Sequence, residues 1–238
     1  MSDNKVVTIH QPVYLPWIGY FYKTYKSDIF IFWDTDQISK GGLGNRNVVK
    51  IPDGTTYITV PIKWKGQSGQ IYKDVEIDNK HKWRGKHRKT LQACYARAEY
   101  FNEYVHIFEE HYEKSWLLLD DLNISLIEAI SDAIGLKCKF IRASCLEVDS
   151  GKDNATARLI GMTKAVGGTK YLSGFGGRNY MDMEMFEQEK IEVEIYDFVH
   201  PVYRQPWGDF VPQLSIVDLL FNEGPNSLEV IKSSHKGE

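Results

Sequence analysis

The sequence predicts an α/β fold: a mostly parallel sheet flanked by helices, with a β-hairpin insertion and a helical insertion. At the start, an apolar β-branched run (Val6–His10), an expected helix over 17–26 and a near-continuously apolar run over 29–33 follow one another. A strand, a helix and a second buried strand favour a parallel sheet. After residue 135, expected strands at 139–143, 169–172 and 191–196 alternate with expected helices at 155–166 and 183–188. This second alternation extends the same sheet.

Two segments interrupt the alternation. Between about 48 and 78, β-rich runs on either side of Pro-Asp-Gly-Thr predict a hairpin, and "QIYKDVEID" predicts a further strand. From about 82 to 135, apolar residues recur at three and four, which predicts helices that stop at Gly135. "LSIVDLLFNEG" predicts the last helix. We expect a single domain over 1–233 and a flexible tail over 234–238.

Composition narrows the class of protein. The chain has 238 residues, 42% of them hydrophobic, and a net charge of -3, so no strong positive field attracts nucleic acid or an anionic membrane. The three cysteines show no CxxC spacing, which is typical of a reducing compartment. The start lacks the pattern of a signal peptide, and no apolar run reaches the ~18 residues that a membrane span needs. We therefore expect a soluble, cytoplasmic protein.

Polar residues follow the predicted strands. In an open parallel sheet, ligands bind at the carboxyl ends of the strands, so we expect a site where these residues gather. The four strand ends carry His10 and Gln11; Asp34, Asp36 and Gln37; Ser144 and Cys145; and "SGFGGR" from Ser173 to Arg178.

His10 is the main candidate for chemistry. A packed or capped histidine is the simpler interpretation, but its strand-end position and Asp34 on a neighbouring strand favour a catalytic pair. Cys145 needs an activating partner that the sequence does not show. Ser173 lacks the GxSxG elbow. "SGFGGRN" is either a phosphate cradle with Arg178 or a tight turn, and the histidine spacings predict no metal site. The sequence leaves open whether Ser144 or Cys145 takes part.

A family resemblance adds context. "IHQPVYLPWIGYFYK", followed by "SDIFIFWDTDQISKGGLGNRNVVK", resembles the start of WbqC-like proteins. "TVPIK", "KYLSGFGGRNY" and "LSIVDLLFNEG" extend the resemblance over essentially the full length. The family commonly has serine where this chain has Cys145, which weakens the case for a thiol nucleophile.

The resemblance implies a role in surface-polysaccharide (O-antigen) biosynthesis: an acyltransferase that moves an acyl or aminoacyl group onto the amino group of a nucleotide-linked amino sugar. No bound cofactor is expected, and the donor would be an acyl thioester of coenzyme A or of an acyl carrier protein. His10 and Asp34 would be catalytic, and Gly174, Gly176 or Gly177 would stabilise an oxyanion. Aromatic side chains would stack on the ligand, and Lys23 or Arg46 would meet its diphosphate. The matching substrate-binding positions are Gln11, Tyr14, Trp17, Tyr20, Lys23, Arg46, Asn47, Ser173, Gly174 and Tyr180.

Two alternatives remain open from the sequence. An adenylate-forming or nucleotidyl-transferring enzyme also places histidine between a first strand and helix, although only His10 is present here and the HxGH pair is missing. A non-catalytic module that binds a sugar nucleotide would use the Trp and Tyr side chains as platforms and would not need a paired imidazole. The sequence does not determine the oligomeric state.

Overall fold

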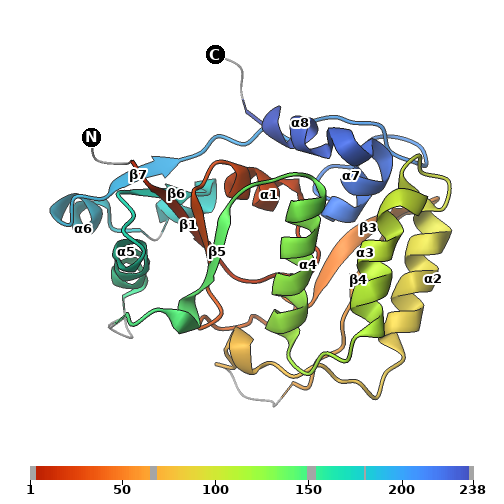
Figure 1. The fold of residues 1–238 in the computed structure, drawn as a ribbon, viewed down its shortest axis with the longest axis horizontal. Helices are drawn as coiled ribbons and strands as arrows, with labels where there is room; N and C mark the ends of the chain where they lie inside the picture. Colours follow the sequence, from red (N-terminus) through yellow and green to blue (C-terminus); the bar gives the residue numbers. More distant parts are fainter. Residues whose placement is uncertain (1–3, 65–68, 149–153, 180, 236–238) are drawn as a thin grey trace.

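The central feature of the fold is a parallel sheet. The computed structural model describes residues 4–64, 69–148, 154–179 and 181–235, and within them five parallel strands form one sheet in the order β5-β2-β1-β6-β7 (Figure 1). The chain starts at β1 in the middle, adds β2 and β5 on one side, and then returns to add β6 and β7 on the other. The strand order therefore reverses between β1 and β6, and the predicted α/β fold is confirmed. The strands are β1 (Val6–His10), β2 (Ile29–Phe32), β5 (Lys139–Arg142), β6 (Lys170–Ser173) and β7 (Glu192–Ile195).

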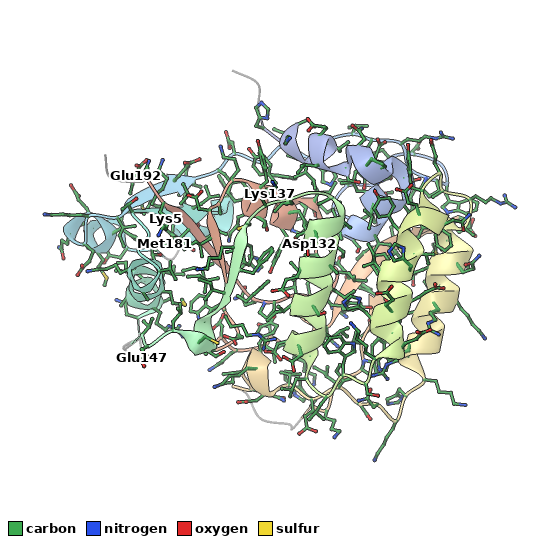
Figure 2. The ribbon with its side chains drawn as sticks, viewed as in Figure 1. Lys5, Asp132, Lys137, Glu147, Met181 and Glu192 are labelled. Carbon is green, nitrogen blue, oxygen red and sulfur yellow. The ribbon has the colours of Figure 1, made fainter. Side chains whose placement is uncertain are left out.

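Helices cover both faces of this sheet. Because side chains alternate along a strand, Ile29 and Ile31 of β2 enter one core and Phe30 and Phe32 enter the other. Figure 2 shows side chains filling the space on both sides of the sheet. The smaller core is closed by α5 (Ala155–Ala165) and α6 (Met183–Gln188), and the larger one by α1 (Ile18–Tyr25), α4 (Leu119–Ala133), α7 (Ile216–Glu223) and α8 (Ser227–Lys232).

Both predicted insertions are present, with one error. Strands β3 (Arg46–Ile51) and β4 (Gly54–Thr59) form an antiparallel hairpin of their own. Helix α2 (Trp83–Tyr95) packs against the hairpin, and α3 (Phe101–Glu113) packs against α2. The strand predicted over 70–78 is wrong, because a 3₁₀ turn, η1 (Tyr72–Asp74), occupies its middle. The N–H groups of Tyr72 and Lys73 donate to the carbonyls of Asp36 and Asp34, at 3.0 and 2.9 Å. The segment thus pairs with loops instead of with a sheet.

The C-terminal end is also more ordered than the sequence pattern predicts. Helix α8 follows the predicted last helix, and its six residues are too few to show a clear period. Ser234, placed in the expected tail, is buried, and its carbonyl accepts a hydrogen bond from the N–H of Val199 at 2.9 Å. The packed part of the chain therefore extends at least to Ser234.

The loop between β1 and α1 has a fixed path. Leu15 adopts the left-handed conformation (φ +44°), which is uncommon for a bulky residue and needs support from its surroundings. Asn47 of the hairpin donates to the carbonyls of Tyr14 and Leu15, at 3.3 and 2.8 Å, and the Ser215 hydroxyl donates to the Leu15 carbonyl at 2.9 Å. These anchors position the start of α1 beside the end of β1.

Candidate functional site

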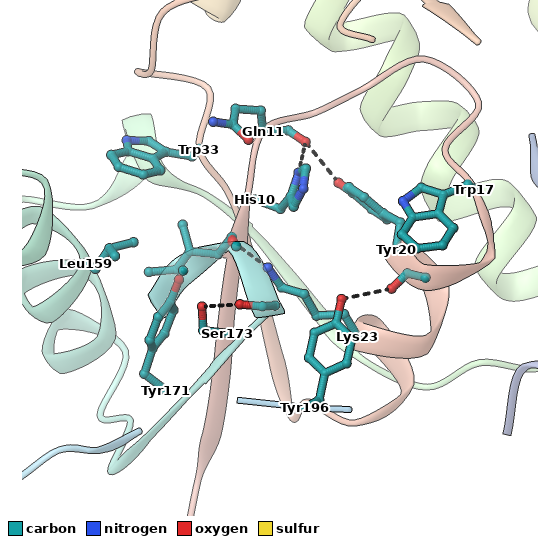
Figure 3. Close-up of a pocket in the computed structure, with 15 residues that line it drawn as sticks. His10, Gln11, Trp17, Tyr20, Lys23, Trp33, Leu159, Tyr171, Ser173 and Tyr196 are labelled. Carbon is teal, nitrogen blue, oxygen red and sulfur yellow. Dashed lines mark hydrogen bonds between the residues drawn. The ribbon is translucent and has the colours of Figure 1, made fainter. Parts of the chain in front are cut away.

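A cavity of about 290 Å³ opens at the carboxyl ends of β1 and β6 (Figure 3). This is the switch point of the sheet, where open α/β folds bind their ligands. The volume lies at the lower end of the range for ligand pockets, so it suits one sugar ring or a short acyl group. The lining residues come from β1, α1, β6 and the segments around them: Ile9, His10, Gln11, Trp17, Gly19, Tyr20, Lys23, Trp33, Leu159, Tyr171, Ser173, Gly174, Gly176, Gly177 and Tyr196.

His10 has a defined protonation pattern. Its Nδ1 lies 3.1 Å from the Gln11 carbonyl, which can only accept, so Nδ1 carries the proton. Burial, with a smaller contribution from the charge of Lys23, lowers the pKa of His10 from 6.5 to about 3. The imidazole is therefore neutral at physiological pH, and its Nε2 carries a lone pair. Among the described residues, no hydrogen bond occupies Nε2 of His10.

Lys23 is a buried amine in the same cavity. Only 5% of the residue is exposed, and Nζ donates to the Ile9 carbonyl at 2.8 Å. Burial lowers the pKa of Lys23 from 10.5 to about 7. The amine therefore exchanges its proton near neutral pH, which is the property required of a general acid or base. The family resemblance implies a different role for Lys23, as a ligand for a diphosphate.

Aromatic side chains at the start of α1 and just after β7 form one wall. The Tyr20 hydroxyl donates to the Gln11 carbonyl at 3.2 Å, and its ring meets His10 edge-on, with the ring centroids 4.9 Å apart. A Cβ atom at Gly19 would overlap the indole of Trp17, so the glycine allows that ring to lie flat against α1. Tyr196 donates to the Gly19 carbonyl at 3.5 Å, and burial raises its pKa to about 12. These rings are held in place before any ligand arrives.

The opposite rim is the glycine-rich turn after β6. The Ser173 hydroxyl donates to the Gly174 carbonyl at 3.2 Å, and the N–H of Gly177 donates to the same carbonyl at 2.9 Å. A Cβ atom at Gly177 would overlap the Ser173 hydroxyl, so close approach explains this glycine. The N–H of Gly177, one of three expected oxyanion donors, is therefore already occupied within the turn.

Asp34 does not orient His10. Its carboxylate is buried and accepts from Ser144, through the backbone N–H at 2.8 Å and through the hydroxyl. The reason is strand order: β5 lies on the far side of β2 from β1, so the end of β2 turns towards Ser144. The expected imidazole–carboxylate pair is not formed. Gln11 makes the contact between these strand ends instead, donating to the Asp36 carboxylate at 2.7 Å.

Three residues expected to bind substrate do not line the cavity. Tyr14 is fully buried, and its hydroxyl lies 3.0 Å from Nδ1 of His87 and 2.7 Å from the Tyr112 hydroxyl. Arg46 donates to the Gly41 carbonyl and lies over the ring of Tyr57. Asn47 is buried and anchors the loop after β1, as described above. Tyr180 lies outside the described residues.

Comparisons with known proteins confirm the family resemblance of the opening motif. The model of the WbqC-like protein family matches residues 11–230. The chain belongs to the WbqC-like protein family. A Mycobacterium tuberculosis relative, "Uncharacterized protein Rv1507c", is 34% identical over 230 residues, which cover 96% of this WbqC-like chain and 98% of the relative. No solved structure matches the chain.

Sequence reasoning missed Ile9 and Gly19 within the opening motif of this WbqC-like protein, and four lining residues outside it: Trp33, Leu159, Tyr171 and Tyr196. Tyr171 could have been found, because it precedes Ser173 by two positions on the same strand and therefore points to the same face. The other three enter from β2, α5 and the end of β7, and their approach depends on strand order.

The described residues contain no group of three or more His, Cys, Asp or Glu side chains placed to hold a metal ion. None of their helices is long and apolar enough to cross a membrane.

Proposed function

We propose that this WbqC-like protein transfers an acyl or aminoacyl group from a thioester to the amino group of a nucleotide-linked amino sugar, in the biosynthesis of a surface polysaccharide such as O-antigen. The thioester would be that of coenzyme A or of an acyl carrier protein. The observation that supports the proposal most is the hydrogen bond from His10 to the Gln11 carbonyl. It fixes the tautomer and leaves an acceptor nitrogen beside a second buried base, Lys23.

The two nitrogens suit the steps of aminolysis. The sugar amine attacks the thioester carbonyl, a C–N bond forms, the C–S bond breaks, and the sulfur leaves as a thiolate. Nε2 of His10 accepts a hydrogen bond from the amine and so aims its lone pair at the carbonyl. The proton that the nitrogen loses goes to Lys23, because an amine with a pKa of about 7 holds a proton far better than an imidazole with a pKa of about 3. Lys23 then returns the proton to the thiolate.

Ligand size decides how the substrate would lie. A cavity of about 290 Å³ holds the amino sugar, so the nucleotide extends past the rim. Trp17 and Tyr20 face the sugar ring. Arg178, exposed on the glycine-rich turn beside Phe175, then meets the diphosphate in place of the distant Arg46.

The test is an acyl-transfer assay by mass spectrometry. The protein is incubated with a panel of nucleotide-linked amino sugars and acyl thioesters, and the sugar is examined for the mass of one acyl group. We expect His10→Phe, which keeps an aromatic ring but removes the accepting nitrogen, to slow transfer by roughly 10²-fold or more, because the amine is no longer aimed at the carbonyl. His106→Phe, an exposed change on α3, is the matched control and should leave the rate unchanged. A His10→Phe rate within a few-fold of wild type would contradict the role of His10.

The same panel separates the alternatives. Release of pyrophosphate from a nucleoside triphosphate, without any mass gain on the sugar, would favour nucleotidyl transfer. Saturable binding of sugar nucleotides that survives loss of His10, without turnover, would favour a binding module.

A further inference from the structure

Another cavity, of about 460 Å³, lies at the far end of the molecule. It is bounded by the turn between α2 and α3, by the loop that leads into α7, and by the last turn of α7; these parts meet away from β1 and β6 (Figure 1). It shares no lining residue with the cavity of Figure 3. Its lining residues are Arg97, Ala98, Glu99, Arg204, Gln205, Pro206, Trp207 and Asn222.

Two guanidinium groups line this cavity without compensation. Arg97 and Arg204 come from segments far apart in the sequence, and both side chains are exposed. Within the described part of the chain, neither makes a hydrogen bond or an ion pair, and Glu99, the acidic residue in the lining, pairs with neither. Two like charges beside one cavity repel each other, so their placement favours an anion between them.

A buried polar network holds the loop that carries Arg204. Gln205 donates to the Val211 carbonyl at 2.8 Å and accepts from the Val211 N–H at 2.8 Å, which closes the loop on itself. Lys50, only 2% exposed, donates to Gln205 at 3.2 Å and to the Asp209 carbonyl. Burying a lysine is costly, and these contacts hold a surface loop in one shape. The loop is therefore preorganised.

Trp207 forms one side of the cavity in a strained conformation. It lies in the left-handed region (φ +59°), followed by Gly208 at φ +57°. For a bulky residue this costs on the order of 1–3 kcal/mol, and such residues cluster at ligand sites. The indole N–H donates to the Cys94 carbonyl at 3.0 Å, which fixes the plane of the ring. The cavity thus combines two arginines that have no partner among the described residues with one rigid aromatic surface.

We infer that this cavity binds a phosphorylated ligand, with the phosphoryl oxygens on Arg97 and Arg204 and the body of the ligand against the indole of Trp207. Guanidinium groups match phosphoryl oxygens with two parallel hydrogen bonds. The remaining polar lining, Glu99 and Asn222, suits hydroxyl groups on a sugar. Nucleoside diphosphates and sugar phosphates share this chemistry. The inference does not depend on the proposed acyl transfer.

The test is calorimetric titration of the full chain with inorganic pyrophosphate, uridine diphosphate and a hexose 1-phosphate. We expect saturable binding of at least one of them. Arg97→Gln and Arg204→Gln should each weaken it about tenfold or more, because each removes a charge-assisted hydrogen bond. Lys89→Gln, an exposed change on α2 that also removes one positive charge, is the matched control and should change binding less than twofold. The ligand that binds tightest shows whether the cavity favours a nucleoside diphosphate or a sugar phosphate.

Two outcomes would overturn the inference. The first is that none of the three ligands binds saturably up to about 10 mM, well above the micromolar to millimolar range of ordinary ligand affinities. The second is that both arginine variants bind like wild type while Lys23→Met loses binding, which would place the ligand in the cavity of Figure 3.

The role of the Trp207 indole is tested separately. If the body of the ligand lies on Trp207, uridine diphosphate binds wild type more tightly than pyrophosphate does, and Trp207→Leu removes that difference. Thermal unfolding without ligand checks that each variant is folded. Should Trp207→Leu not fold, the comparison of the two ligands on wild type still decides, because equal affinities would contradict the role given to the indole.

Discussion

Replacing Lys23 by methionine should make the protein more stable, and by an amount that depends on pH. The folded state lowers the pKa of Lys23 from 10.5 to about 7, because the amine is buried beside the Ile9 carbonyl. The unfolded chain therefore binds a proton that the folded chain releases between these two pH values. For a group of this kind, the destabilisation is complete below the folded pKa and disappears as pH rises towards the unfolded pKa.

The size of the effect follows from the two pKa values. Near pH 6 the penalty for burying Lys23 is about 5 kcal/mol, and near pH 9 it falls to about 2 kcal/mol. Methionine carries no such penalty, but it leaves the Ile9 carbonyl without its donor, which costs about 1 kcal/mol at every pH. Lys23→Met should therefore raise the free energy of unfolding by about 4 kcal/mol near pH 6 and by about 1 kcal/mol near pH 9.

Urea unfolding of both proteins across this pH range measures the difference. Every other titrating group is present in both proteins, and His10, whose pKa the charge of Lys23 also lowers, is neutral in the folded state across this pH range, so the other contributions cancel. Lys26→Met, a change on the exposed flank just after α1, is the matched control and should show no trend with pH. A constant difference between wild type and Lys23→Met would refute the reasoning, since it would mean that Lys23 keeps its proton in the folded state. The stabilised variant should also be inactive in acyl transfer.

Three further predictions follow from single contacts. Gly85→Ala, inside α2 with no atom within 4 Å of its new Cβ, should raise the free energy of unfolding by about 0.5–1 kcal/mol in a urea titration; a loss of stability would contradict this. Gly19→Ala should push the indole of Trp17 from the cavity wall, which costs about 1–3 kcal/mol and shifts the tryptophan fluorescence; an unchanged spectrum would mean that the ring does not move. Burial lowers the pKa of His87 from 6.5 to about 4, so its contribution is present above pH ~6.5 and is lost as pH falls. From about pH 7 to pH 5 this should remove about 2 kcal/mol in wild type, and the loss should be smaller by that amount in His87→Phe.

The sheet could be predicted because its strands are locally distinct. The run over 29–33 is apolar at every position, which only a strand buried on both faces requires. The segment over 70–78 has a strand-like pattern as well, yet its backbone pairs with loops, and loop positions depend on tertiary structure. Helix α8 has six residues and shows too little periodicity to be recognised. The local sequence pattern therefore identified the segments that pair with a neighbouring strand or form a helix long enough to show a period.

The site could be predicted only as a set of strand ends. His10 and Ser173 do line one cavity, because β1 and β6 are neighbouring parallel strands. No local sequence pattern shows which strand lies on which side of β1. The sequence therefore could not predict that Ser144, just after β5, would bind the Asp34 carboxylate.

The opening motif also divides into two groups that no sequence pattern separates. His10, Trp17, Tyr20 and Lys23 line the cavity, while Tyr14 is part of a buried network with His87 and Tyr112.

The position of the Asp34 carboxylate, on Ser144 and not beside His10, determines the protonation of the nitrogens in the site. A carboxylate beside His10 would raise the pKa of the imidazole and, next to it, that of Lys23, so both nitrogens would carry protons at neutral pH. Because Asp34 is bound by Ser144 instead, no carboxylate of the described residues raises the pKa of His10 or Lys23. Burial then keeps the imidazole neutral and brings the amine to its titration point. The proposed transfer needs unprotonated nitrogens to take a proton from the amine, and the separation of Asp34 from His10 provides them. Introducing a carboxylate at the rim, as in Ser173→Asp, should therefore raise the pKa that governs the rate, and a pH–rate profile of the variant that coincides with that of wild type would contradict this account.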